Sequence, residues 1–177
     1  SKTPRQVRIA WYGDSAIVSD GYTGVVRRRL QERFGVAGPG FILAAPTFEG
    51  YLRDGVRLKR TGWTSNAVIS GELESGRYGY GGIVSAGFGG ASATYEAKKP
   101  VSAIEVFFEG QKKGGKIEIW SGKGKDPVAV IDTADKGAEV ARHVFAAPVK
   151  DVKIKVVGGP VKVYGVVLEV AERGVQL

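Results

Sequence analysis

The stretch that decides the fold is VRIAWYGDSAIVSDGYTGVVRRRLQERFG, residues 7–35. Over residues 7–12 the apolar side chains alternate with others, which is the pattern of a β-strand. Asp20 is a good N-cap residue, and apolar side chains then recur at helical spacing until Gly35, a common helix stop. The stretch therefore predicts a strand, a turn at Gly-Asp-Ser and a helix over about 20–34, the opening of an α/β unit.

The predicted helix has one apolar stripe and one charged side. We expect the apolar stripe to pack against the strand, through Val25, Val26, Leu30 and Phe34. Arginines 27–29 with Arg33 are interpreted as the solvated side of this helix, although such a cluster can also contact a polyanion. No zinc-finger spacing and no RNP-type strand accompanies them, so no nucleic-acid partner is predicted.

The sequence changes in character after residue 60. Short β-like runs follow one another between glycines and prolines, and charged and apolar residues alternate in KIEIW (116–120) and DVKIKVV (151–157). Runs of this kind, about 8–12 residues apart, predict an antiparallel sandwich or jelly roll. The predicted fold class is an α/β start over 1–58, an all-β jelly-roll or sandwich domain over 62–170, and a returning strand over 171–177.

Composition excludes several classes of site. The 177 residues include 27 glycines but no cysteine and no methionine, so no disulfide and no thiolate metal site is predicted. No metal-ligand spacing and no phosphate loop is found, and no cofactor is predicted. No apolar run approaches the roughly 20 residues of a membrane span. Because the chain does not begin with methionine, we expect that an upstream signal peptide or tag is removed.

One group of glycines receives a structural interpretation. No GK[ST] follows these glycines and no helix is predicted there, so they are expected to mark β-turns and bulges: Gly79, Gly81, Gly82, Gly87, Gly89 and Gly90.

The run YGDS (12–15), followed by DGYTG and an amphipathic helix, resembles the first sequence block of the SGNH (GDSL-type) hydrolases. The longer run GYTGVVRRRLQERFGVAGPGF (21–41) is similar to bacterial members that act on cell-wall or polysaccharide esters. Some of these, the peptidoglycan O-acetylesterases among them, carry an inserted carbohydrate-module-like β-sandwich after this block. The resemblance implies the first strand and helix of a three-layer α/β/α domain, with GVQL (174–177) as the strand that leads into the second block.

The resemblance also implies roles for two residues. Ser15 would be the nucleophile that attacks an ester carbonyl, and its backbone N–H would be one oxyanion donor. Asp14 would support the loop through its carboxylate. The implied substrate is an acylated carbohydrate or peptidoglycan, and the implied location is periplasmic or extracellular.

The other catalytic groups of this family are not found in the sequence. The family uses a glycine N–H, an asparagine amide and an Asp-x-x-His motif, but Asn66 and His143 stand in neither context. His143 is interpreted as a residue of the β-domain. We therefore expect a second polypeptide to supply these groups, with a histidine ring roughly 3 Å from the Ser15 hydroxyl.

An alternative function remains open. The β-domain would bind glycan as a non-catalytic module, and the Gly-Asp-Ser segment would be vestigial. Aromatic side chains stack on the C–H faces of sugars when they are exposed, and the candidates are Trp63, Tyr78, Tyr80, Tyr95 and Trp120.

Overall fold

The computed structural model describes residues 6–71 and 76–177. Its elements, in chain order, are β1 (Gln6–Arg8), the 3-10 helix η1 (Ser15–Ile17), α1 (Gly21–Phe34), β2 (Gly40–Ile42), β3 (Val56–Ala67), the 3-10 helix η2 (Val68–Ser70), β4 (Ile83–Glu109), β5 (Lys116–Ser121), β6 (Ala129–Asp132), β7 (Ala138–Val157), β8 (Val161–Glu169) and β9 (Gly174–Gln176). Within the described ranges, no helix is both long and apolar enough to span a bilayer.

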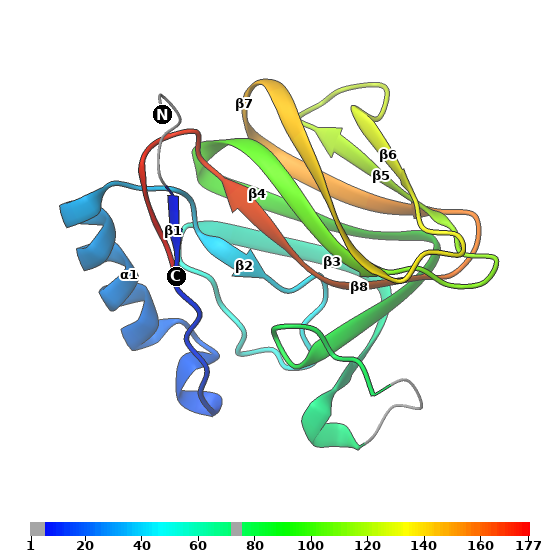
Figure 1. Ribbon diagram of the computed structural model, residues 1–177, viewed down its shortest axis with the longest axis horizontal. Helices are drawn as coiled ribbons and strands as arrows, with labels where there is room; N and C mark the ends of the chain where they lie inside the picture. Colours follow the sequence, from blue (N-terminus) through cyan, green and yellow to red (C-terminus); the bar gives the residue numbers. More distant parts are fainter. Residues whose placement is uncertain (1–5, 72–75) are drawn as a thin grey trace.

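A small α/β unit, made of β1, α1 and β9, lies at one side of the molecule (Figure 1). β1 and β9 pair in parallel, with Val7 opposite Val175, and α1 packs against β9. Gly35 ends the helix at φ 95°, as predicted. A Cβ at Gly35 would lie 2.2 Å from the Arg173 carbonyl oxygen, so glycine permits the chain to pass close to the start of β9.

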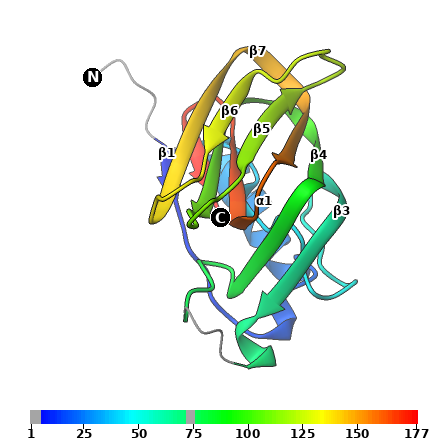
Figure 2. The ribbon, with the colours of Figure 1, turned by 90° about the vertical axis from the view of Figure 1, so that its right-hand side faces the viewer.

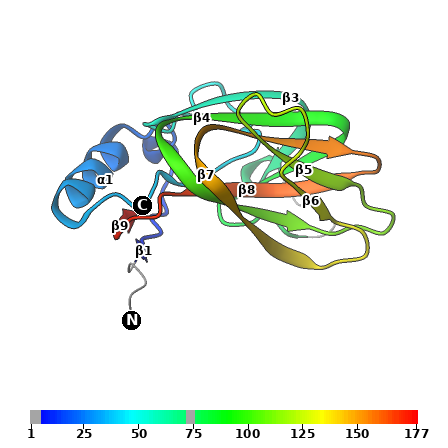
Figure 3. The same ribbon diagram turned by 90° about the horizontal axis from the view of Figure 1, so that it is seen from above.

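The rest of the chain forms a sandwich whose two layers share the long strands β4 and β7. Residues 83–97 of β4 lie beside β3, and residues 92–96 also pair with the second half of β7. Residues 103–109 of β4 lie between β8 and the first half of β7. With β5 and β6 beyond β7, and β2 beyond β8, the strand orders are β3–β4–β7–β5–β6 and β2–β8–β4–β7, and residues 85–87 of β4 also pair with the start of β8. Figures 2 and 3 show the sandwich from two further sides. The predicted α/β start followed by a β-sandwich is confirmed.

The hydrophobic core lies between the two layers. Alternate residues of β4, β5 and β7 point inward, and Tyr95, Ile119 and Ile154 are completely or almost completely buried. Their neighbours Thr94 and Trp120 are half-buried on the outer surface. This period of two is the alternation that predicted the strands.

Two strands are longer than the sequence pattern predicts. β4 joins three β-like runs of the sequence, GGIVSAGF (81–88), ASATYEA (91–97) and VSAIEVFFEG (101–110), and β7 joins EVARHVFAAP (139–148) and DVKIKVV (151–157). Gly87, Gly89 and Gly90 therefore lie inside β4, and the register of β3 against β4 shifts between Thr61 and Trp63, opposite these glycines. The strand accommodates the glycines as an irregularity in pairing and does not reverse direction there.

The first strand is shorter than the predicted strand 7–12. β1 ends at Arg8, and the Ile9 N–H donates to the Gln176 carbonyl oxygen at 2.9 Å. β9 also ends at Gln176. Beyond that point the chain has no neighbouring strand among the described residues, so it leaves the extended ladder before Gly13.

The helix is confirmed, but its apolar stripe does not pack as predicted. Val25 and Phe34 are 42% and 52% exposed, whereas Thr23, Gly24 and Arg27 are buried. The prediction that Arg27 is solvated is wrong, because its guanidinium pairs with a buried carboxylate. The stripe stays open because the α/β sheet has only two strands among the described residues, so it covers one side of the helix.

The segment after α1 contributes to the sandwich. β2 pairs antiparallel with β8, with Ile42 opposite Val166. Ile42 and Ala44 are fully buried in the sandwich core. The sandwich therefore includes residues that precede residue 58.

Candidate functional site

Ser15 is the first residue of η1 and lies seven residues after Arg8, the last residue of β1. It is exposed, and its hydroxyl makes no hydrogen bond to any residue that the structure describes. The Asp14 carboxylate Oδ1 accepts the backbone N–H of Ala16 at 2.9 Å, which fixes the turn around the serine. The Ser15 backbone N–H has no acceptor in the described part of the chain. It is therefore free to donate to a negatively charged oxygen at this turn.

A buried ion network fixes the loop between Ser15 and α1. Asp20 adopts a left-handed conformation with φ 56°, and its Oδ1 accepts from Thr23 Oγ1 and from Arg27 Nη1, both at 2.9 Å. Burial alone would raise the pKa of Asp20. The hydrogen bond from Arg27, the charge of Arg53 and the backbone N–H of Asp54 outweigh burial and lower this pKa overall.

The same network ties the α/β unit to the sandwich. The Asp54 N–H, in the loop that leads to β3, donates to Asp20 Oδ2 at 2.8 Å. Arg53 donates to the carbonyl oxygens of Pro39 and Leu177. On another side, Arg8 of β1 binds Glu105 of β4 with Nη1–Oε2 2.8 Å. These contacts hold the turn at Ser15 in one position relative to the sandwich.

Aromatic residues stand on both sides of the Gly-Asp-Ser turn in the sequence. Trp11 and Tyr22, in the first turn of α1, meet edge to face with ring centroids 5.6 Å apart. Both are partly exposed, and Tyr12 is exposed as well. The sequence analysis does not include these three aromatic residues among the site candidates. The position of Trp11 and Tyr12 directly before Gly-Asp-Ser is the signal in the sequence that points to them.

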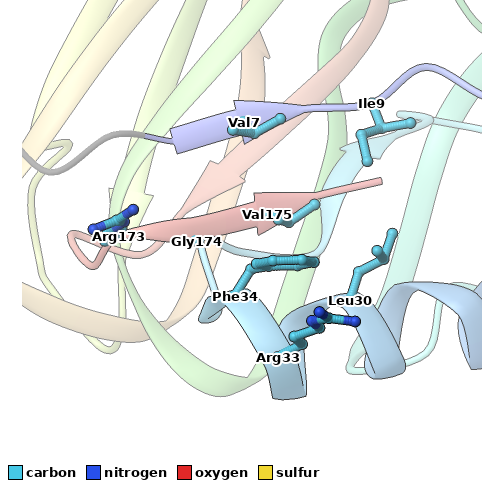
Figure 4. A pocket seen from close by; sticks show the side chains of 8 residues that line it. All are labelled: Val7, Ile9, Leu30, Arg33, Phe34, Arg173, Gly174 and Val175. Atoms are coloured by element: carbon cyan, nitrogen blue, oxygen red, sulfur yellow. The ribbon is translucent and has the colours of Figure 1, made fainter.

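An open apolar hollow of about 520 Å³ lies between α1 and the β1–β9 sheet. Figure 4 shows Val7 on β1, Ile9 just after β1, Val175 on β9, and Leu30 and Phe34 on α1 around it. Apolar side chains on a parallel sheet are normally covered by further strands or helices. This hollow is therefore an uncovered face of the α/β unit.

The structure keeps His143 and Asn66 away from the α/β unit. His143 lies on β7 opposite Ile104 of β4, with its ring 5.1 Å from that of Phe145. Its interpretation as a β-domain residue agrees with this position. Asn66 is exposed on β3, opposite Val84. Neither is brought to Ser15.

The candidate glycan-contacting aromatics fall into two groups. Tyr95 is fully buried in the core, and Trp63 packs against the core while its Nε1 donates to the Ser92 carbonyl oxygen at 2.8 Å. Tyr95 is therefore not available for sugar stacking, and Trp63 serves mainly in packing. Tyr80 and Trp120 keep ring surface at the exterior.

The remaining candidate, Tyr78, is half-buried, and its hydroxyl donates to the Gly71 carbonyl oxygen.

No group of three His, Cys, Asp or Glu side chains in the described ranges could hold a metal ion.

The chain is similar to solved structures in its fold. No protein-family model and no curated protein matches the chain. A solved peptidoglycan O-acetylesterase matches with a TM-score of 0.71 at 20% identity, over 98% of this chain and 45% of that one. A family 32 carbohydrate-binding module from C. perfringens NanJ, in complex with galactose, has a TM-score of 0.44 at 18% identity over 65% of this chain and 93% of the module. A family 29 module has a TM-score of 0.46 at 14% identity, over 78% and 95%.

The chain spans less than half the length of the esterase that it matches. At this identity the likeness concerns the fold, which includes both the strand–helix start and the sandwich. The chain therefore has the fold of a part of a peptidoglycan O-acetylesterase: a short α/β unit interrupted by a β-sandwich.

Proposed function

We propose that this chain is the N-terminal portion of an SGNH-type serine esterase that deacylates a cell-wall or polysaccharide ester. The observation that carries the proposal is the position of Ser15. It is exposed at the first residue of η1, in the connection that leads from the carboxyl end of β1 to α1, and connections that follow strand ends of α/β sheets are where such folds bind their ligands. The fold match over 98% of the chain supports it. A substrate of this kind places the protein in the periplasm or outside the cell.

In the proposed reaction the Ser15 hydroxyl oxygen attacks the ester carbonyl carbon, and a histidine takes the hydroxyl proton. The Ser15 N–H donates to the oxyanion. The bond between the acyl carbon and the sugar oxygen then breaks, and the sugar leaves as an alcohol with that proton. Water then attacks the acyl-serine while the same base takes its proton, the bond between the acyl carbon and Ser15 Oγ breaks, Ser15 regains that proton, and the acyl group leaves as a carboxylic acid. Asp14 keeps the turn in place throughout, through its bond to Ala16.

The base and the other oxyanion donors come, in this proposal, from polypeptide outside this chain. The uncovered hollow around Val7, Ile9 and Phe34 supports this assignment, because its apolar wall needs a covering layer. The covering polypeptide would add strands beside β1 and bring a glycine N–H, an asparagine amide and an Asp-x-x-His motif to Ser15.

The test is acetate release from O-acetylated peptidoglycan by the complete product of the gene. We expect release by the unmodified protein, none by its Ser15→Ala variant, and none by the 177-residue chain alone. Release that persists in the Ser15→Ala variant would overturn the assignment of Ser15 and leave glycan binding by the sandwich as the better account.

A further inference from the structure

The outer surface of the layer β3–β4–β7–β5–β6 carries a row of polar and aromatic side chains. Trp120 of β5 lies opposite Lys153 of β7, and Lys153 lies opposite Thr94 of β4. Thr94 in turn lies opposite Lys59 of β3. Because neighbouring strands are about 4.8 Å apart, this row extends for roughly 14 Å across four strands.

A small hollow of about 170 Å³ lies at the Trp120 end of this row. It is lined by Trp120, Thr94, Asp151 and Lys153, together with Gly122, Gly124 and Val152. The hollow thus combines an aromatic surface with a hydroxyl, a carboxylate and an ammonium group. A pyranose ring needs this combination, with an apolar C–H face on one side and hydroxyl groups around its edge.

Two charged groups of the hollow, those of Lys153 and Asp151, form no ion pair with the residues that the structure describes, whereas the Trp120 Nε1 donates to Glu118 Oε2 at 3.0 Å. Lys153 Nζ lies 5.3 Å from the centre of the Trp120 ring, and no carboxylate in the described ranges lies within ion-pair distance of it. The Asp151 carboxylate likewise accepts no hydrogen bond from the residues that the structure describes. Lys59, further along the row, is already paired with Glu96. The charges of Lys153 and Asp151 therefore lie beside Trp120 without an ion-pair partner in the described ranges.

The other exposed aromatic candidate differs in this respect. Tyr80 meets the rings of Phe41 and Phe107 edge to face, at 6.2 and 5.7 Å between centroids. Its ring therefore packs within an aromatic cluster, and it borders neither of the two hollows described above. Tyr80 is for that reason a suitable control residue.

We propose that the hollow beside Trp120 binds one sugar ring of the glycan chain whose ester is the substrate. The proposal rests on the proposed function, because a cell-wall substrate makes the bound chain one of N-acetylated amino sugars. The Trp120 ring contacts the C–H face of the sugar. Lys153 donates to a sugar oxygen, and Asp151 accepts from a sugar hydroxyl. Binding here would hold the glycan on the sandwich while an ester elsewhere on the same chain reaches Ser15.

The experiment titrates the 177-residue chain with chitotetraose by calorimetry and follows the amide signals of β5 and β7 by NMR. We expect binding, with Trp120→Ala and Asp151→Asn each weakening it by about tenfold or more. The matched controls Tyr80→Ala and Lys112→Gln leave the affinity within about twofold. Asp151→Asn keeps the size of the side chain, so it tests the site even if the tryptophan variant does not fold.

Three results would overturn the proposal: no binding of chitotetraose at millimolar concentration, binding that neither Trp120→Ala nor Asp151→Asn weakens, or tighter binding of cellotetraose than of chitotetraose. The Ser15→Ala variant is expected to bind chitotetraose as the unmodified chain does. A failure at Ser15 and a failure at the Trp120 hollow are therefore distinguishable, because chitotetraose carries no ester and its binding needs no catalytic group.

Discussion

Asp20 Oδ1 accepts a hydrogen bond from Arg27 Nη1 at 2.9 Å, and both side chains are almost completely buried. The two residues lie two helical turns apart, so the pair bridges the start of α1 and its middle. The same carboxylate lies 3.6 Å from Arg53 Nη1 and accepts the Asp54 N–H. It therefore joins α1, which follows the Ser15 turn, to the loop that enters the sandwich.

We expect Asp20→Asn to lower the free energy of unfolding by about 3–5 kcal/mol, because it leaves the guanidinium of Arg27 buried without its counter-charge. Urea denaturation measures the change. The matched control is Asp54→Asn, whose carboxylate pairs with Arg28 at the surface and should cost less than about 1 kcal/mol. Equal losses in the two variants would contradict the structural role of Asp20.

The contribution of Asp20 should also depend on pH. The pKa of Asp20 in the folded protein lies below its ordinary value of 3.8. Its stabilisation is therefore fully present above that value and is lost as pH falls through the lower, folded-state pKa. In a series of thermal melts from neutral to acidic pH, the difference between the unmodified chain and Asp20→Asn should shrink below about pH 4. A difference in melting temperature between the two proteins that stays constant into strong acid would contradict the lowered pKa of Asp20.

Gly35 and Gly55 provide a matched pair of substitutions at the helix end and in a loop. Both have positive φ, 95° and 89°, but a Cβ at Gly35 would meet the Arg173 carbonyl oxygen, whereas a Cβ at Gly55 meets nothing within 4 Å. Gly55→Ala should cost about 1 kcal/mol from backbone strain alone. Gly35→Ala should cost at least about 1 kcal/mol more, because β9 must shift. Chemical denaturation measures the free energy of unfolding of both variants. Similar losses of this free energy would contradict the close approach of Gly35 to the Arg173 carbonyl oxygen.

The sandwich should fold on its own when β2 is included. A fragment of residues 38–170 keeps Ile42 in the core, whereas a fragment of residues 62–170 loses β2 and half of β3. We expect β-type circular dichroism from the longer fragment and a cooperative melt. The shorter fragment should be less stable by at least about 3 kcal/mol, because it leaves the Ile42 site empty. A dominant helical spectrum, or equal stability of the two fragments, would contradict the assignment of β2 to the sandwich.

The 177-residue chain alone should not hydrolyse p-nitrophenyl acetate faster than its Ser15→Ala variant. The reason is that neither His143 nor Asn66 lies on the α/β unit, and a single missing oxyanion donor already costs about 10²–10³ in rate. Initial rates at equal protein concentration measure this. A Ser15-dependent rate from the isolated chain would show that a base is present within it.

The sequence predicts the elements better than it predicts their contacts. The periodicity of residues 21–34 and the alternation after residue 60 identify α1 and the sandwich, because both patterns are local. The burial of Arg27 could not be predicted, because it depends on the distant loop that brings Arg53 and the Asp54 N–H to Asp20, the partner of Arg27. The continuity of β4 could not be predicted, because glycines are common in turns as well as in bulges. It depends on the pairing of β4 with β3 and β7.

For the candidate sites, too, the sequence predicts local features but not the contacts between distant residues. Ser15 could be selected because its neighbours in sequence make the strand–turn–helix context. Trp120 could be placed on an outer face because Ile117 and Ile119 alternate with it. Its proximity to Asp151 and Lys153 could not be predicted, since it depends on the register between β5 and β7.

The most direct test of the central claim, that Ser15 is the nucleophile of an esterase, is covalent labelling. The complete product of the gene is treated with a fluorophosphonate and analysed by peptide mass spectrometry. Our account predicts one adduct, on Ser15, with no labelling of the Ser15→Ala variant and none of the 177-residue chain alone. Labelling of a different serine, or of none, in a gene product that releases acetate from peptidoglycan would contradict it.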